Sequence, residues 1–350
     1  MKKLIWMTLA LLLCASCTAL PAEERSFAVA LGVSENTGTW EVSARVPTYQ
    51  SGGGYLTLTA QGNSLSEALA VLDATAPMQM HLGQLRLVVL SQGLAESSAF
   101  PAVLTELAMR REFRVQAQVC VTSDRVSDLM DKLEPATGSR LSKALDVLLE
   151  TRMEQGVIPE AELSEVIRRG ERQSWVAINV ALEDTAGIAR PGMDSAAGTQ
   201  AASGTGKVQF GGGWLIGQNG SANGQLTAAD MQLLGLMAGK LQKGMLSLPD
   251  GTVPLIGATS KVKLRGNTVA CDVSLRYGAS GMTEAGVQRA VTEACRNVLQ
   301  KLAAANCDAL GVGRQAIRYF PDMAAWHVLD WPGLYPQLHW QVTIIPSRAT

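Results

Sequence analysis

The sequence is poor in the residues that most often bind metals or perform acid-base chemistry. It has three histidines and six cysteines, and after residue 17 no two cysteines have a C-x-x-C spacing. Structural zinc sites are built from closely spaced cysteine and histidine ligands. We therefore predict no metal site, and we find no motif that calls for a bound cofactor.

Concentrated charge is also scarce. Lys and Arg number 30 against 31 Asp and Glu, and no basic cluster is interleaved with aromatic residues. Nucleic-acid binding needs such a surface, because contacts to phosphates supply much of the affinity. We therefore expect no nucleic acid as a partner. The formal net charge of −1 becomes −3 (28 Lys and Arg against 31 Asp and Glu) once Lys2 and Lys3 are removed with the segment described next.

Apolar runs of membrane-spanning length are absent, and the longest one lies at the N-terminus. Lys2 and Lys3 precede an apolar run at residues 4–13. As a helix this run would be ~15 Å long, half of a ~30 Å hydrocarbon core. The pattern is typical of a cleaved secretory signal. We predict a signal peptide at residues 1–16.

The residues around Cys17 resemble a bacterial lipobox. Small residues stand at positions 15 and 16, although Cys14 occupies the place where Leu is usual. In such a segment the peptidase cuts before an acylated cysteine, so Cys17 would be the lipid attachment site. Two or three acyl chains anchor a protein stably, since each buried methylene contributes ~0.8 kcal/mol. The alternative is ordinary cleavage near residues 15–17, without a lipid.

The other four cysteines are interpreted as buried free thiols. Cys120 and Cys271 fall in predicted strands, and Cys295 lies on the apolar face of a predicted helix. Cys295 and Cys307 cannot bridge along one unbroken helix, because twelve residues of helix span ~18 Å. The sequence leaves the disulfide state of all four otherwise open.

The first part of the chain, residues 17–125, alternates strand and helix signals and is predicted to be an N-terminal α/β domain. A capping pair at Ser64 and Glu67 precedes apolar residues at helical spacing. The predicted elements are, in order, strands at 27–34 and 39–46, a helix at 65–76, a strand at 85–90, a helix at 99–110 and a strand at 113–121.

A smaller, mostly helical second region is predicted at residues 126–184, ending in a strand at 175–182. Residues 185–206 then lose almost all large apolar side chains and keep mainly Gly, Ala, Ser and Thr. Such a composition buries too little surface to offset the entropy of ordering. We therefore predict a flexible linker and a domain boundary at 185–206.

Residues 207–350 are predicted to form a C-terminal α+β domain. Its longest helix, at 283–304, carries Val287, Val291 and Val298 on one side, which is the amphipathicity of a helix lying on a sheet. The other predicted elements are a strand at 208–216, a helix at 227–242, a hairpin at 262–277 and a strand at 339–345. The fold class is thus α+β and multi-domain, with mixed or antiparallel sheets each packed with helices.

Fragments that resemble enzyme motifs stand in the wrong context, so we predict no catalytic residue. Residues 311–316 fit G-x-G-x-x-A, but they follow a helix and precede a predicted strand, the reverse of the order in dinucleotide sites. His327 and Asp330 lack a nucleophile elbow. Asp308 is interpreted as a side chain that orders its loop by hydrogen bonds to backbone amides.

The chain resembles the Ger(x)C lipoproteins, the C subunits of spore germinant receptors. The resemblance covers nearly the whole chain after the signal segment, including residues 27–33, 81–90 and 210–217. Its most specific part is a C-terminal signature, structural or at an interface, consisting of Asp308, Gly311, Gly313, Trp326 and Trp331. The two tryptophans are expected to anchor the last segment to its sheet, or one of them to contact a partner. Residues 18–22 replace the short Trp-Asp segment that is usual after the lipid cysteine.

This resemblance implies a non-enzymatic subunit on the outer face of the spore inner membrane. Its implied partners are the membrane-spanning A and B subunits of a receptor that responds to nutrients, together with the bilayer that holds acylated Cys17. One alternative is an exported substrate-binding lipoprotein that captures a small nutrient in a cleft between domains. A less favoured alternative is an extracytoplasmic hydrolase, for which the sequence offers no nucleophile or metal set.

Overall fold

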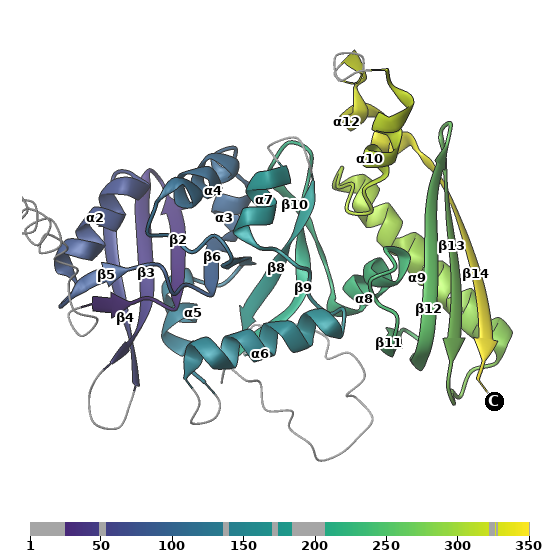
Figure 1. Cartoon of the computed structure of the whole chain (residues 1–350), viewed down its shortest axis with the longest axis horizontal. Helices are drawn as coiled ribbons and strands as arrows, with labels where there is room; N and C mark the ends of the chain where they lie inside the picture. Colours follow the sequence, from purple (N-terminus) through teal and green to yellow (C-terminus); the bar gives the residue numbers. More distant parts are fainter. Residues whose placement is uncertain are drawn as a thin grey trace, which may run out of the picture.

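The computed structural model describes residues 25–48, 54–135, 140–169, 174–183, 207–321, 326 and 328–349. The predicted signal peptide at 1–16, the predicted lipid attachment site Cys17 and the predicted linker at 185–206 lie outside the described residues. Two lobes, each built on one large sheet, follow one another along the long axis of the molecule (Figure 1). The predicted α+β, multi-domain fold is confirmed.

The first lobe is built on an eight-stranded sheet in the order β10-β9-β8-β7-β6-β2-β3-β4. β2, β6, β7 and β8 run parallel, and the strands on either side of them pair antiparallel. Consecutive residues Leu87, Val88 and Val89 are all 0% exposed, which requires cover on both faces of the sheet. The strands are β2 (Ala30–Asn36), β3 (Thr39–Thr48), β4 (Gly54–Gly62), β6 (Leu87–Ser91), β7 (Gln118–Thr122), β8 (Trp175–Leu182), β9 (Val208–Ile216) and β10 (Ala222–Leu226).

Helices cover this sheet, and a short parallel pair, β1 (Arg25–Phe27) and β5 (Gln79–His81), lies beside it. The Ser64 hydroxyl accepts the Glu67 N–H at 3.1 Å, and the Glu67 carboxylate accepts the Asn63 N–H at 2.8 Å, so the predicted helix start is confirmed. The helices are α2 (Leu65–Thr75), α3 (Gln92–Glu96), α4 (Phe100–Met109), α5 (Val126–Lys132), α6 (Leu141–Glu154) and α7 (Leu163–Arg169).

The second lobe is built on a four-stranded sheet in the order β11-β12-β13-β14. Its strands are β11 (Gly244–Leu248), β12 (Gly251–Arg265), β13 (Thr268–Tyr277) and β14 (His339–Arg348). β14 pairs parallel with β13, and the other pairs are antiparallel. Helix α9 (Glu284–Ala304) packs on one face of this sheet through the predicted apolar stripe, which includes Val287, Val291 and Val298. Within the described ranges, no helix combines the length and apolar character of a membrane span.

Helix α8 (Ala228–Met237) joins the two lobes. It is buried on nearly all sides and contacts β9 of the first sheet as well as β11 and β12 of the second. Buried Gln232 uses its amide for this connection: Nε2 donates to the carbonyls of Gln155 and Met245, and Oε1 accepts the Ser247 N–H. A buried amide with all of these partners fixes the helix against both lobes.

The predicted boundaries at 125 and 207 are not boundaries between sheets. β7 pairs with β8 at Cys120 and Ile178, and β8 pairs with β9 from Trp175 to Leu182. The mostly helical region and the start of the predicted C-terminal domain therefore both contribute strands to the first sheet. The small-residue composition of 185–206 marks a connection between two adjacent antiparallel strands, which the sequence alone did not distinguish from a linker between domains.

The predicted strand at 113–121 is shorter in the structure and covers only β7. Phe113 and Ala117 lie in turns, with their N–H groups bonded to the carbonyls of Arg110 and Arg114. Both side chains are buried, so the apolar alternation there reflects packing of turns and not an extended strand.

Candidate functional site

The signature residues gather at one end of the second lobe, in a unit that we call the tip (Figure 1). The tip consists of α10 (Val312–Ala316), η2 (Ile317–Tyr319), α12 (Trp331–Leu334) and η3 (Tyr335–Gln337). Its interior is a small apolar cluster on the end of the β12–β13 hairpin, formed by Leu264, Val269, Val312, Ala316, Trp331 and Tyr335. The strand predicted to follow residues 311–316 is wrong, because residues 317–319 form the 3-10 helix η2.

Asp308 organises the entrance to the tip. Its Oδ1 accepts the Val312 N–H at 2.8 Å, and its Oδ2 accepts the Gly313 N–H at 2.6 Å. These are the first two N–H groups of α10, which no carbonyl within the helix can satisfy. Both carboxylate oxygens are thus used to start a helix, which agrees with a role in ordering the loop.

The turn that carries Asp308 also bonds to the first lobe. The Asp308 N–H donates to the Ser174 hydroxyl at 2.6 Å, and the Cys307 thiol approaches the Trp175 carbonyl at 3.5 Å. On the side of the tip, the Tyr335 hydroxyl donates to the Cys307 carbonyl at 2.9 Å. The turn therefore connects β8, α9 and the tip through short polar contacts.

Burial is the dominant influence on the Asp308 carboxyl. It raises the pKa of Asp308 from 3.8 to about 6, while the hydrogen bonds from Gly313, Val312 and Gly311 act in the opposite direction. Burial together with the nearby Asp308 charge raises the pKa of Tyr335 well above its usual value, so the tyrosine keeps the proton that it donates to Cys307.

The two signature glycines serve different purposes. Gly311 has a φ of 70°, in the left-handed region, and a Cβ there would meet only the Arg314 side chain at 3.9 Å. Gly313 has no such backbone requirement, but a Cβ would lie 2.8 Å from Trp331 Nε1 and 3.0 Å from Asp308 Oδ2. Its N–H is already bonded to Asp308, so the segment offers no glycine amide there to a phosphate.

Aromatic rings run in a continuous chain through the tip. Ring centroids are 5.4 Å apart for Phe320 and Trp326, 5.6 Å for Trp326 and Trp331, and 6.1 Å for Trp331 and Tyr335. Tyr335 lies 6.3 Å from Trp340 on β14. Trp331 is buried and Trp326 is half-buried, so the chain leads from the surface to the sheet, as expected for residues that anchor the segment.

Two further tip residues were not singled out from the sequence. Gln315 donates to the Val262 carbonyl at 3.0 Å and accepts the Leu264 N–H at 3.3 Å, so its amide covers the part of β12 that extends beyond β11. Tyr335 follows Trp331 at a spacing of four residues. That spacing indicates a shared helical face, although it does not indicate the hydroxyl's partner.

Two large apolar side chains, one on η2 and one on the segment just before α12, are exposed at the tip beside exposed charged residues such as Arg314 and Arg318. Tyr319 is 74% exposed and Val328 is 87% exposed, and only Met109 on α4 has a comparable exposure among the large apolar residues described. Both residues are close in sequence to the aromatic chain of the tip. The signature residues themselves are mostly buried or half-buried. His327, which the sequence placed near Trp326, lies outside the described residues, and Asp330 caps α12 through the Gly333 N–H.

The described part of the chain contains no group of three or more His, Cys, Asp or Glu placed to hold a metal ion. Cys120, Cys271, Cys295 and Cys307 are all free and buried, which confirms the interpretation as buried thiols. Burial raises the pKa of Cys271 to about 11 and that of Cys295 to about 12, so these thiols stay protonated and are poor nucleophiles.

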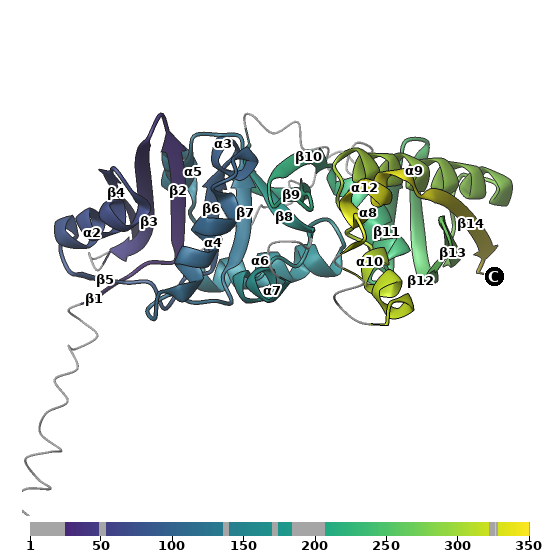
Figure 2. The ribbon, with the colours of Figure 1, turned by 90° about the horizontal axis from the view of Figure 1, so that it is seen from above.

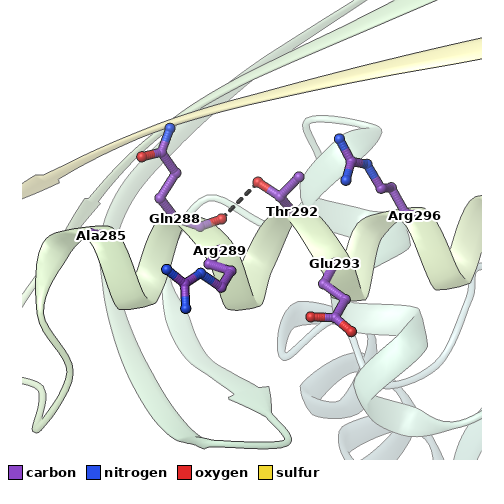
Figure 3. Close-up of a pocket in the computed structure, with 6 residues that line it drawn as sticks. All are labelled: Ala285, Gln288, Arg289, Thr292, Glu293 and Arg296. Atoms are coloured by element: carbon purple, nitrogen blue, oxygen red, sulfur yellow. Dashed lines mark hydrogen bonds between the residues drawn. The ribbon is translucent and has the colours of Figure 1, made fainter.

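A surface hollow of about 580 Å³ lies along α9. It is lined by Ala285, Gln288, Arg289, Thr292, Glu293 and Arg296, and Figure 3 shows that all six belong to the one helix. Its volume would suit a small ligand, but ligand sites bury most of the ligand between converging walls. This hollow therefore lends no support to nutrient capture in a cleft between domains.

Comparison with known proteins identifies the class. Residues 19–176 match the family described as the spore germination protein N-terminal domain. The crystal structure of the GerBC protein has a similar fold, with a TM-score of 0.55 and 14% sequence identity, over 91% of this chain and 97% of that one. No curated protein sequence matches the chain significantly.

Residues 19–176 therefore form an N-terminal domain of the spore germination protein family, and the resemblance to the Ger(x)C family predicted from the sequence is confirmed over that domain. The chain as a whole shares the fold of GerBC.

Titration of Asp308 should make stability depend on pH. Because its folded pKa of about 6 exceeds the ordinary 3.8, the folded state holds the proton more tightly. The stabilisation is therefore complete below about pH 4 and is lost as the pH rises to about 6, by about 3 kcal/mol. Urea unfolding from pH 4 to 7 should show this slope in the wild type and not in Asp308→Asn. Equal slopes in both proteins would contradict the assignment.

The two glycines should respond differently to a methyl group. We expect Gly311→Ala to cost ~1 kcal/mol, the usual strain of a left-handed residue. Gly313→Ala should cost ~1–3 kcal/mol, because Trp331 and Asp308 occupy the space. Gly281→Ala, which has open space and no positive φ, is the matched control and should change unfolding by less than ~0.5 kcal/mol. A Gly313→Ala protein as stable as the control would show that the tip is loosely packed.

Proposed function

We propose that the chain is the lipid-anchored C subunit of a nutrient germinant receptor. In this role acyl groups on Cys17 hold it at the outer face of the spore inner membrane, and it acts as an assembly or interaction subunit with the membrane-spanning A and B subunits. The observation that carries the proposal is the match of residues 19–176 to the spore germination domain. The similar fold of GerBC over 91% of the chain supports the same role for the remainder.

The geometry of the signature favours an interaction subunit over an enzyme. Asp308, the largely buried carboxylate at the entrance to the tip, has both oxygens bonded to backbone amides. A general base needs access to the proton that it removes. The side chains that the tip does present to solvent, Tyr319 and Val328, are of the kind that bind by burial of apolar surface.

We assign the contact with the membrane-spanning subunits to this outer surface of the tip. Aromatic residues on a rigid support are preferred anchors at protein interfaces, because little side-chain entropy is lost when they are buried. Tyr319 ends η2, which follows α10 directly, and Val328 lies two residues before Asp330, the cap of α12, so both stand next to short helices of the tip.

Acylation and membrane recovery test the anchor. In spores we expect mass spectrometry to find acyl chains on an N-terminal Cys17, and fractionation to recover the protein with membranes. Cys17→Ala should leave the folded chain in the soluble fraction and lower the A and B subunits recovered with it at least tenfold. An unmodified Cys17 in wild-type spores, or membrane recovery without A and B subunits, would contradict the proposal.

Tip variants test the contact itself. Tyr319→Ala with Val328→Ala should leave the urea midpoint unchanged, since both side chains are largely exposed. Recovery of the A and B subunits should fall at least tenfold, the effect of losing one or more anchor residues. Met109→Ala, with 80% exposure on the first lobe, is the control and should recover both subunits at the wild-type level. Equal recovery in all three proteins would remove the tip from the interface.

A further inference from the structure

Among the described elements, no helix packs on one face of the second sheet. Side chains alternate along each strand, so Val253, Cys271 and Ile344 point to the buried side that faces α9. The opposite side, which we call the open sheet face, presents exposed residues from β12, β13 and β14, including Lys261, Lys263, Arg265, Asp272, Arg276 and Ile345.

The open sheet face is strongly basic for this chain. The four strands of the sheet contain five Lys and Arg and one Asp, a formal charge of +4. The whole chain has a formal charge of −1, so the remaining residues carry −5, the difference between the two. The sheet thus carries a net positive charge, with four of its five cations and its one Asp on the open sheet face, while the rest of the chain is net negative.

The cations of β12 stand in a row. Lys261, Lys263 and Arg265 occupy alternate positions of one strand, which spaces them ~6.6 Å apart on the same face. The charge of Lys261, with a smaller contribution from Arg265, lowers the pKa of Lys263, as expected for neighbouring ammonium groups with few counter-ions. Asp272 is the nearest strand carboxylate and pairs across the sheet with Lys261.

Apolar side chains border the cations on the same sheet. Met245 is 50% exposed, Ile256 is 38% exposed and Ile345 is 58% exposed. Segments that bind at a membrane interface combine cations, which attract anionic lipids, with apolar side chains that enter the headgroup boundary. A flat strand surface presents both kinds of side chain to a planar partner at once.

The start of the described chain constrains the partner further. Seven residues lie between Cys17 and Arg25, and the eight Cα–Cα steps between the two span at most ~29 Å when fully extended. In Figure 2, α9 lies along the upper edge of the second lobe with the strands of its sheet beneath, and β1 lies along the lower edge of the first lobe. In this view the strands of the second sheet and the start of β1 both lie below the level of α9.

We propose that the open sheet face binds the anionic phospholipid surface of the membrane. This inference builds on the proposed function, because the tether at Cys17 would bring the face to a bilayer. The lipid headgroups would contact Lys261, Lys263, Arg265 and Arg276, and the body would lie along the membrane with its α9 side facing away.

Vesicle sedimentation tests the proposal without the anchor. The chain from residue 17 on, produced without acylation, is mixed with vesicles of phosphatidylcholine alone or with one third phosphatidylglycerol. We expect binding to the anionic vesicles only, weakening as salt screens the charges. Binding to both kinds of vesicle, or to neither, would overturn the proposal.

Charge variants locate the contact. Each Lys or Arg near an anionic surface contributes about fivefold to partitioning, so Lys261→Gln with Lys263→Gln should weaken binding about 25-fold. Asp272→Asn should strengthen it about fivefold. Arg289→Gln with Arg296→Gln removes the same charge from the α9 surface shown in Figure 3 and should leave binding within twofold of the wild type.

The outcomes are separable from those for the proposed function. Equal losses from the strand pair and the α9 pair would overturn the open sheet face as the contact, whatever the state of Cys17. All variants should keep the wild-type urea midpoint. If the protein with Lys261→Gln and Lys263→Gln does not fold, the Asp272→Asn variant is the deciding test. Unchanged or weaker vesicle binding by that variant would contradict the proposal. A missing acyl group in spores would refute the anchor and leave these vesicle results as they stand.

Discussion

The structure depends on the turn between α9 and the tip, where the Cys307 and Asp308 backbone meets the first lobe. Ser174 and Trp175 at the start of β8 bond to this turn from one side, and Tyr335 bonds to it from the other. Asn306 adds contacts to Gln218 and to the Pro332 carbonyl. A single buried turn thus fixes the first lobe, the long helix and the tip relative to one another. Satisfying so many polar groups in one buried place requires a unique arrangement of all three.

A second joint makes the connection between the lobes resistant to twisting. Gln232 on α8 bonds to Gln155 of the first lobe and to Met245 and Ser247 of the second. This helix lies at a different place along the interface from the Asp308 turn. The Gln232 bonds and the bonds of the Asp308 turn are two separate contacts between the lobes. Each opposes rotation of one lobe about the other contact, so we expect the two lobes to move as one rigid body.

The sequence predicted elements well where one physical signal dominated. The apolar stripe of α9 and the Ser64 cap of α2 depend only on local spacing, and both are confirmed. β4 and the first half of β12 were missed because Gly54, Pro254 and Gly257 are unfavourable in strands and only pairing with neighbours forms them. The boundary near 185–206 was misjudged because composition does not reveal which strands become neighbours.

For the signature, the sequence indicated that Asp308 bonds to nearby amides. The reason for Gly313 is Trp331, eighteen residues away, and no local pattern contains that contact.

The signature residues stabilise the fold of the tip, and other residues form the surface that a partner would contact. Asp308, Gly313 and Trp331 are interior residues, and their substitution would alter the shape of the tip without touching a partner. The side chains that meet the surroundings are others, such as Tyr319 on the tip and Lys261 on the open sheet face, which are both exposed. Under the proposed anchoring, Cys17 fixes one end of an elongated body and leaves swinging about this tether as the motion that the basic sheet at the other end has to restrain. A second attachment far from the first restrains it at little cost in affinity, because the tether has already raised the effective concentration of the face at the bilayer. The tip, which projects from the second lobe beside the sheet in Figure 1, is then held at a set height and direction relative to the membrane. That is the geometric requirement for a subunit whose task is to meet integral membrane partners.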